Sequence, residues 1–236
     1  MPIAFAVTYG VGSAAFAGML LLVLLGRRPA GPGWRIVLVC AVTLFWTLAA
    51  AVGSTRFAGA TAVLESARSA AWLWFMSSWL AASPQGEGKA SRNYLPILAL
   101  AVGAAAVGND LRFVAAAVDP VHPDFTQILV RVAVAVTGLL VVENLYRNTS
   151  EARRWHVVPI CIGIGGMFAY DLFLYSDALL FRRVDLSLLA ARGAMMALIV
   201  PMLALTLARN RDWRIDIHIS RQAVFHTATL LASGRS

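Results

Sequence analysis

Long apolar runs alternate with short polar stretches along the chain. Most of these runs have about 17–23 apolar residues, enough for a helix that crosses the ~30 Å hydrocarbon core of a bilayer, and the shortest, at residues 94–107, has 14. The runs are continuously apolar, whereas the strands of a membrane β-barrel are segments of about ten residues in which apolar and polar side chains alternate. The pattern predicts an all-α, polytopic bundle of seven transmembrane helices. The expected bounds are Ile3–Leu25, Ile36–Val52, Thr61–Ala82, Tyr94–Val107, Phe125–Val142, Val157–Leu180 and Leu186–Leu207.

The end of the chain differs from the rest. Residues 1–207 form the predicted seven-helix domain, and residues 208–222 form a basic linker. Residues 223–236 hold an apolar stub too short to span a membrane, and the final Gly-Arg-Ser is typical of a cloning remnant. We therefore expect a truncated eighth helix and a native protein that continues beyond it.

The basic residues are distributed unevenly between the expected loops. The first, third and fifth loops and the linker hold twelve of them, and the second, fourth and sixth loops hold four. Because basic loops stay on the cytoplasmic side, the N-terminus is expected outside and the linker in the cytoplasm. Membrane orientation also explains the net charge of +8, so no nucleic-acid partner is expected.

The sequence lacks the residues that several classes of protein function require. The single lysine, Lys89, lies in an expected loop, whereas a retinal Schiff base needs a lysine within a helix. No Walker A, dinucleotide-binding, HExxH or GxSxG motif is present, so no catalysis and no cofactor are expected. Asp119, His122 and Asp124 could bind a divalent cation, but such a group is more often a solvated loop, and no metal site is expected.

Charged residues lie inside the expected helices at a common depth. Glu65, Arg68, Arg131, Asp171 and Arg192 all fall in the outer half of the bilayer on four helices. A carboxylate in a membrane helix costs about 2.5–3.5 kcal/mol unless it meets a partner or water. Glu65 and Arg68 are three residues apart and share a helix face, so they can pair.

The sixth expected helix carries further polar residues, which continue from these buried charges to the membrane surface. Asp171, Tyr175 and Arg182 fall on one helix face at helical spacing. The candidate ligand-binding residues are Glu65, Arg68, Arg131, Tyr170, Asp171, Tyr175 and Arg192, with Asp177, Arg182 and Arg183 at the rim.

Two interpretations of these residues stay open. The five buried charges sum to +1 and arginine offers a fork of donors, which favours a cavity open to the outside for an anionic or sugar-like ligand. Alternatively, the same residues form interhelical salt bridges that hold the bundle together. Arginines near the interface can also extend to the lipid headgroups.

The second half of the chain resembles a known family. The resemblance is carried by Val-Glu-Asn-Leu-Tyr-Arg-Asn-Thr at 142–149, Cys-Ile-Gly-Ile-Gly at 161–165, Asp-Ala-Leu-Leu-Phe-Arg at 177–182 and Ala-Arg-Asn-Arg-Asp-Trp at 208–213. These segments resemble the N-terminal membrane region of the PrsK family. Its members are sensor histidine kinases associated with PEP-CTERM/exosortase and exopolysaccharide systems of Gram-negative bacteria. Before residue 142 only the helix pattern agrees.

The resemblance implies a sensory domain in the bacterial inner membrane. The full protein would form a homodimer and pass phosphate to a response regulator, while this fragment would have no kinase activity. A stand-alone transporter or channel is the main alternative, and it would favour internal repeats and polar residues near the midplane. A membrane enzyme acting on lipid-linked sugars would need a catalytic carboxylate or histidine pair at the interface, and Asp119, His122 and Asp124 are the only approximation to one.

Overall fold

The computed structural model describes residues 2–25, 34–52, 58–82, 89–115 and 124–209. Almost all of these residues are helical, and the described part contains no strand, which confirms the all-α class. The expected linker from residue 210 onward and the stub lie outside the described residues. The helices are α1 (Pro2–Leu25), α2 (Trp34–Val52), α3 (Ala58–Ala82), α4 (Lys89–Ala115), α5 (Phe125–Asn148), α6 (Glu151–Phe181) and α7 (Leu186–Arg209).

Six of these helices, all except α3, are long and apolar enough to cross a membrane. α3 has 25 residues, which is sufficient length, but Glu65, Arg68 and several serines make it less apolar. Large apolar side chains on the other helices face outward, among them Leu22, Phe45 and Ile97. Such a surface suits lipid, and the chain is a multi-pass helical membrane protein.

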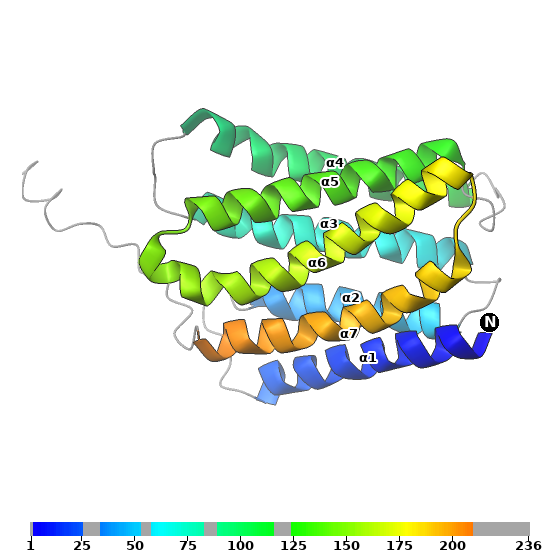
Figure 1. Cartoon of the computed structure of the whole chain (residues 1–236), viewed down its shortest axis with the longest axis horizontal. Helices are drawn as coiled ribbons and strands as arrows, with labels where there is room; N and C mark the ends of the chain where they lie inside the picture. The colour runs from blue at the N-terminus through cyan, green and yellow to red at the C-terminus, as the bar shows by residue number, and fades with distance from the viewer. Residues whose placement is uncertain (1, 26–33, 53–57, 83–88, 116–123, 210–236) are drawn as a thin grey trace, which may run out of the picture.

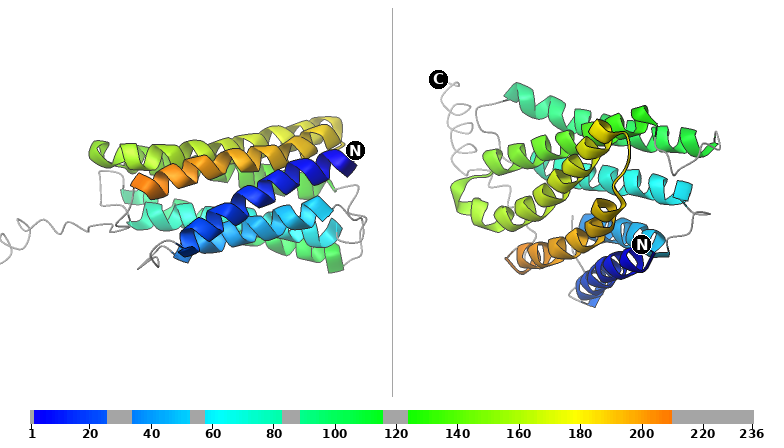
Figure 2. Two further views of the ribbon diagram at one scale, coloured as in Figure 1. Left: turned by 90° about the horizontal axis from the view of Figure 1, so that it is seen from below. Right: turned by 45° about the vertical axis from the view of Figure 1, so that its right-hand side comes forward.

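The helices form a closed ring in chain order. Each helix packs against the next, α7 returns to pack against α1, and α3 also contacts α5. Figure 1 shows the N-terminus at the same end as the connection between α6 and α7, and the views in Figure 2 place α1 beside α7. We call this end the α6–α7 end, and the opposite end, with Thr149 and Ser150, the α5–α6 end.

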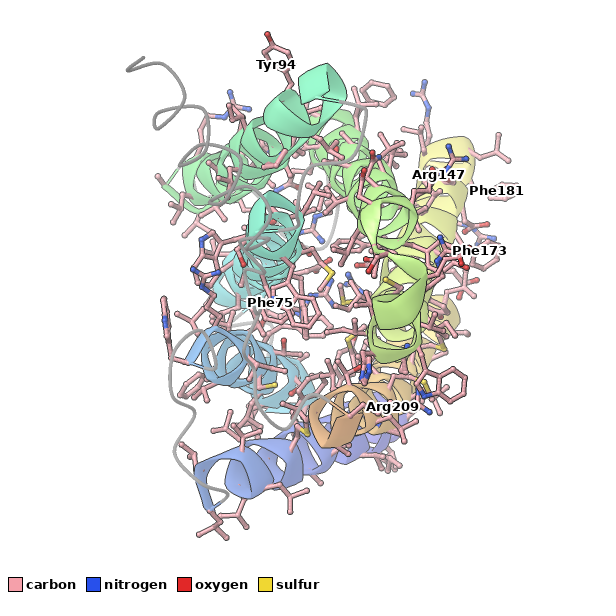
Figure 3. All side chains as sticks on the ribbon, turned by 90° about the vertical axis from the view of Figure 1, so that its left-hand side faces the viewer. Phe75, Tyr94, Arg147, Phe173, Phe181 and Arg209 are labelled. Atoms are coloured by element: carbon pink, nitrogen blue, oxygen red, sulfur yellow. The ribbon has the colours of Figure 1, made fainter. Side chains whose placement is uncertain are left out.

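Aromatic and sulfur-containing side chains fill the centre of the ring. Trp46, Trp72, Phe75 and Phe168 are each at most 1% exposed. Figure 3, viewed along the bundle, shows Phe75 within it, whereas Tyr94 points away from it. The Trp72 indole N–H donates to the Thr43 hydroxyl at 3.1 Å, so this buried polar group has a partner.

Two glycines let helices approach closely. A Cβ atom on Gly193 would lie 2.6 Å from the backbone nitrogen of Tyr9, so α7 touches the backbone of α1 at this position. A Cβ atom on Gly138 would lie 2.4 Å from the ring of Phe168, so that ring from α6 lies directly on α5. A larger side chain at position 193 must push the backbones of α7 and α1 apart, and one at position 138 must displace the Phe168 ring or move the helices.

Several helices are longer than the sequence pattern predicts. α4 continues to Ala115, so the expected connection at residues 108–124 starts later than predicted. α5 ends at Asn148 and α6 begins at Glu151, so most of the expected charged loop at residues 143–156 is helical. Hydropathy marks where an apolar run ends, whereas helical hydrogen bonding between backbone groups continues through polar and charged residues.

Three arginine–aromatic pairs lie towards the α5–α6 end, beside those in other parts of the bundle. The Arg209 guanidinium is 4.2 Å from the Trp155 ring centre, and Arg154 is 5.1 Å from that of Tyr146. Arg35 lies 5.7 Å from the ring of Trp74. Tryptophan, tyrosine and arginine are typical of the boundary between membrane and water.

Candidate functional site

Six charged side chains from five helices meet inside the bundle. We call this set, with one tyrosine, the ionic cluster. It contains three acids, three arginines and a phenol: Glu65, Arg68, Asp110, Arg131, Asp171, Arg192 and Tyr175. All lie roughly 8–15 Å along their helices from the α6–α7 end, given ~1.5 Å per residue.

Arg192 joins the two halves of the ionic cluster. Its Nε lies 2.7 Å from Asp171 Oδ1 on α6, and its Nη1 lies 2.6 Å from Glu65 Oε1 on α3. The side chain is 1% exposed. Arg192 directly precedes Gly193, where α7 touches α1, so the same turn of α7 fixes both contacts.

Glu65 receives donors from three helices. Arg131 Nη1 on α5 lies 2.8 Å from Glu65 Oε2, and Arg192 reaches the other oxygen from α7. The Tyr175 hydroxyl on α6 also donates to Glu65 Oε1. That hydroxyl in turn accepts from Arg131 Nη1 at 2.7 Å, so carboxylate and phenol share the arginine. Such shared, charge-assisted bonds are stronger than isolated ones.

Arg68 anchors the side of the cluster nearest α2. Its Nη2 lies 2.7 Å from Asp171 Oδ2, and the side chain is fully buried. Its guanidinium carbon lies 4.3 Å from the centre of the Trp46 ring, and that of Arg192 lies 5.0 Å from it. Trp46 thus contacts two desolvated cations through its aromatic face. The expected pair of Arg68 with Glu65 is replaced, because each finds its ion-pair partners on other helices.

Asp110 is a member of the cluster that the sequence pattern did not select. It is 2% exposed, its Oδ2 accepts from the Ser66 hydroxyl at 2.5 Å, and the same oxygen lies 3.4 Å from Arg131 Nη2. It was assigned to a connection because the apolar run ends at Val107. The absence of any Gly or Pro between Gly108 and Pro120 is the signal that could have extended the helix.

With Asp110 included, the cluster is electrically balanced. The expected charge of +1 counted two carboxylates against three arginines, and the third carboxylate brings the formal sum to zero. An excess of positive charge therefore does not support an anionic ligand. Any preference for anions has to come from how individual donor groups are occupied.

The remaining predicted residues lie around the cluster, not in it. The Tyr170 hydroxyl donates to the Leu188 carbonyl at 2.6 Å and so links α6 to α7. Asp177 is half-buried, and Arg182 and Arg183 are exposed in the α6–α7 connection. Arg182 has a left-handed backbone with φ 51° and ends α6. Tyr9 on α1 was not predicted, and its hydroxyl donates to the Leu189 carbonyl at 2.9 Å.

Asp185 fixes the start of α7 next to these rim residues. Its Oδ1 accepts from the backbone N–H groups of Ser187 at 2.7 Å and Leu188 at 3.2 Å. These are the second and third residues of the helix, which an N-cap side chain normally satisfies. The N–H groups of Leu188 and Ser187 hold the pKa of the Asp185 carboxyl below its ordinary value.

The cluster encloses very little free space. The cavity lined by Glu65, Arg131, Asp171, Tyr175 and Arg192 offers about 10 Å³ to the centre of a water molecule. That is roughly the minimum for one ordered water. The geometry is that of a closed interhelical salt-bridge network, and a larger ligand could enter only if helices moved apart.

Comparisons of the chain with models of known protein families, with curated proteins and with solved structures give no match. Two of the three residues that could bind a divalent cation, Asp119 and His122, lie outside the described residues. Asp124 is the N-cap of α5, and its Oδ1 accepts from the backbone N–H of Phe125 at 2.9 Å.

Proposed function

We propose that the chain is the signal-input domain of a membrane sensor histidine kinase. The observation that supports it best is the ionic cluster, in which α3, α4, α5, α6 and α7 share one set of buried ion pairs. Buried pairs are a weak source of stability, because desolvation of the charges offsets most of their attraction. A network of this kind is better suited to holding helices in one of a few discrete arrangements.

We further propose seven membrane spans in the bacterial inner membrane, with the N-terminus outside. The pairs of Arg35, Arg154 and Arg209 with aromatic rings support a cytoplasmic α5–α6 end. α3 completes the count, because its charged residues face partners inside the bundle and not lipid. The cluster then lies nearer the outer surface, where a ligand from the periplasm can reach it.

The signal would travel along α7. Arg192 ties the outer part of α7 to α3 and α6, and α7 runs from there to Arg209 at the opposite end. A stimulus that favours a second arrangement of the cluster would shift α7, typically with about 1–3 kcal/mol of coupling. Following the resemblance to the PrsK family, kinase domains after α7 would form a homodimer and phosphorylate a response regulator.

The size of the native protein tests this proposal. An immunoblot of membranes from the source cells, with an antibody raised against this chain, should detect a species several-fold larger than the 25.3 kDa of this chain. A species near 25 kDa would overturn the kinase assignment and favour the stand-alone transporter or channel. Phosphorylation of the larger species by ATP in the same membranes would be the second expected result.

A further inference from the structure

One edge of Arg131 is almost unused, unlike the rest of the cluster. Its Nη1 is occupied by Glu65 at 2.8 Å and by the Tyr175 hydroxyl at 2.7 Å. Within the described part of the chain, its Nη2 has a single polar contact, with Asp110 at 3.4 Å. Its Nε is buried and has no hydrogen-bond partner among the described residues. Nε–H and Nη2–H point the same way, and together they form the side of a guanidinium that binds two oxygens of a carboxylate or phosphate.

The other two arginines do not offer such an edge. Arg192 gives its Nε to Asp171 at 2.7 Å and is 1% exposed. The Nε of Arg68 also lacks a partner among the described residues, but its Nη2 already serves Asp171 and Ser69. Arg68 is fully buried, whereas the side chain of Arg131 is 16% exposed. Of these three arginines, only Arg131 combines an almost unused edge with a side chain that reaches the surface.

Asp110 lies where a bound oxyanion would compete. It is held mainly from α3 by Ser66, and Gln127 Nε2 on α5 lies 3.4 Å from its other oxygen. Both contacts between α4 and α5 at this point, to Arg131 and to Gln127, are therefore long. The seam between α4 and α5 is the weakest side of the cluster, and Arg131 lies only six residues, or about 9 Å, from the start of α5.

We propose that the Nε–Nη2 edge of Arg131 binds the carboxylate or phosphate group of a ligand that enters between α4 and α5 at the α6–α7 end. Asp110 is the internal competitor that the ligand displaces. This inference rests on the proposed sensory function and names the ligand chemistry of the same cluster. Displacement of Asp110 removes the ion pair between α4 and α5, so the bound and free states differ in helix contacts, which signalling requires.

Binding of two simple oxyanions to the full chain in a neutral detergent tests the proposal. The probes are acetate and inorganic phosphate. Isothermal titration calorimetry measures their affinity, and the shift in the thermal unfolding temperature confirms binding. Asp110→Asn keeps the shape of the competitor but removes its charge, so its affinity for a probe should rise about tenfold or more over wild type. Arg131→Lys keeps the charge but loses the planar edge, and it should abolish that gain in the double variant.

Arg112→Lys is the matched control, because Arg112 lies at the same end of the bundle but is exposed, and among the described residues its guanidinium contacts the nearby Asn109 and Phe113. Equal affinities in wild type, Asp110→Asn and the double variant would overturn the proposal. It would also be overturned if Arg112→Lys, combined with Asp110→Asn, lowered the affinity as much as Arg131→Lys does. If the double variant does not fold, the ¹⁵N resonance of Arg131 Nε in Asp110→Asn decides. It must move on titration with acetate, and an unchanged resonance would reject the site.

The oxyanion could also come from a lipid headgroup. The calorimetry is therefore repeated in bilayer discs of phosphatidylcholine and of phosphatidylglycerol. Weaker acetate binding in the phosphatidylglycerol discs would mean that the lipid headgroup occupies the Arg131 edge. Equal acetate affinity in both kinds of disc would mean that the ligand is soluble. The result is independent of the immunoblot, because a 25 kDa species would reject the kinase assignment and leave the oxyanion site measurable.

Discussion

Arg192 shows at the level of one residue why the buried charges are tolerated. It reaches carboxylates on two other helices and is almost fully buried. Removing one partner of a buried pair leaves the others desolvated and unpaired, which is costlier than the pair was worth. Its neighbours cannot move to compensate, because Glu65 and Asp171 are also held by Arg131 and Arg68.

We expect Arg192→Met to lower the free energy of unfolding by about 3–5 kcal/mol. Methionine keeps the length of the side chain, so the loss reports the buried negative charge that only Arg131 and Arg68 then balance, more than a cavity. Unfolding of the purified protein in mixed micelles with increasing denaturing detergent measures the effect.

Arg147→Met is the matched control for this variant. Arg147 pairs with Glu143 one turn away at 3.0 Å, but the two side chains are 75% and 51% exposed. Exposed pairs are worth about 0.2–1 kcal/mol. Similar losses in the two variants would show that the cluster is not an energetic unit.

Asp185 gives a pH-dependent prediction at the start of α7. Its folded-state pKa is lowered by the backbone N–H groups of Leu188 and Ser187, so the cap is fully formed above the ordinary aspartate pKa of about 3.9. Its contribution is lost as the pH falls through the lower folded-state pKa. In NMR titrations the Asp185 carboxyl carbon and the Ser187 amide should therefore titrate together below about pH 3.9.

Asp185→Asn separates the cap from its charge. Asparagine caps helices about as well as aspartate, so α7 should start at the same residue. The Ser187 amide should then show no titration in that range. A midpoint at or above the ordinary aspartate value in the wild type would contradict the capping role.

At the level of elements, the contact between α5 and α6 depends on a missing side chain. Gly138→Ala would place a methyl group against the Phe168 ring, which is fully buried. We expect a loss of about 1–3 kcal/mol, since overpacking forces side chains or backbone to shift. Thermal unfolding of the purified protein measures it.

Gly18→Ala on α1 is the corresponding control. A Cβ atom at Gly18 has no atom within 4 Å among the described residues. Alanine should stabilise that helix by about 0.5–1 kcal/mol through backbone entropy alone. Opposite signs for the two substitutions are expected, and equal signs would mean that the glycine at 138 is not a packing requirement.

The sequence predicts the elements better than their ends. Apolar runs predicted all seven helices, because a membrane helix needs a continuous apolar stretch. The ends of α4 and α5 were missed, since Asp110 and Glu143 interrupt the apolar run without interrupting the helix. This one error concealed a member of the ionic cluster and the electrical balance of the whole site.

For the molecule as a whole, the sequence predicted a meeting of charges but not their pairing. Equal depth followed from counting residues along each helix, and Arg68, Arg131 and Arg192 do meet Glu65 and Asp171. Which arginine serves which carboxylate depends on helix rotation and on the closure of the ring between α1 and α7. Both depend on packing between helices that are far apart in the sequence, which the residue pattern within one helix does not determine.

Orientation in the membrane remains the last prediction, and the two ends of α5 provide a matched pair of sites. Thr126 and Asn148 are both exposed, and they lie near opposite ends of this one helix. The native Cys40 and Cys161 are buried, so the wild type gives a low background. With the N-terminus outside, a membrane-impermeant maleimide added to spheroplasts should label Thr126→Cys and leave Asn148→Cys unlabelled. Inverted membrane vesicles should give the reverse pattern. Labelling of Asn148→Cys in intact spheroplasts would place the arginine-rich end outside, and the ionic cluster would then face the cytoplasm and could not receive a periplasmic ligand.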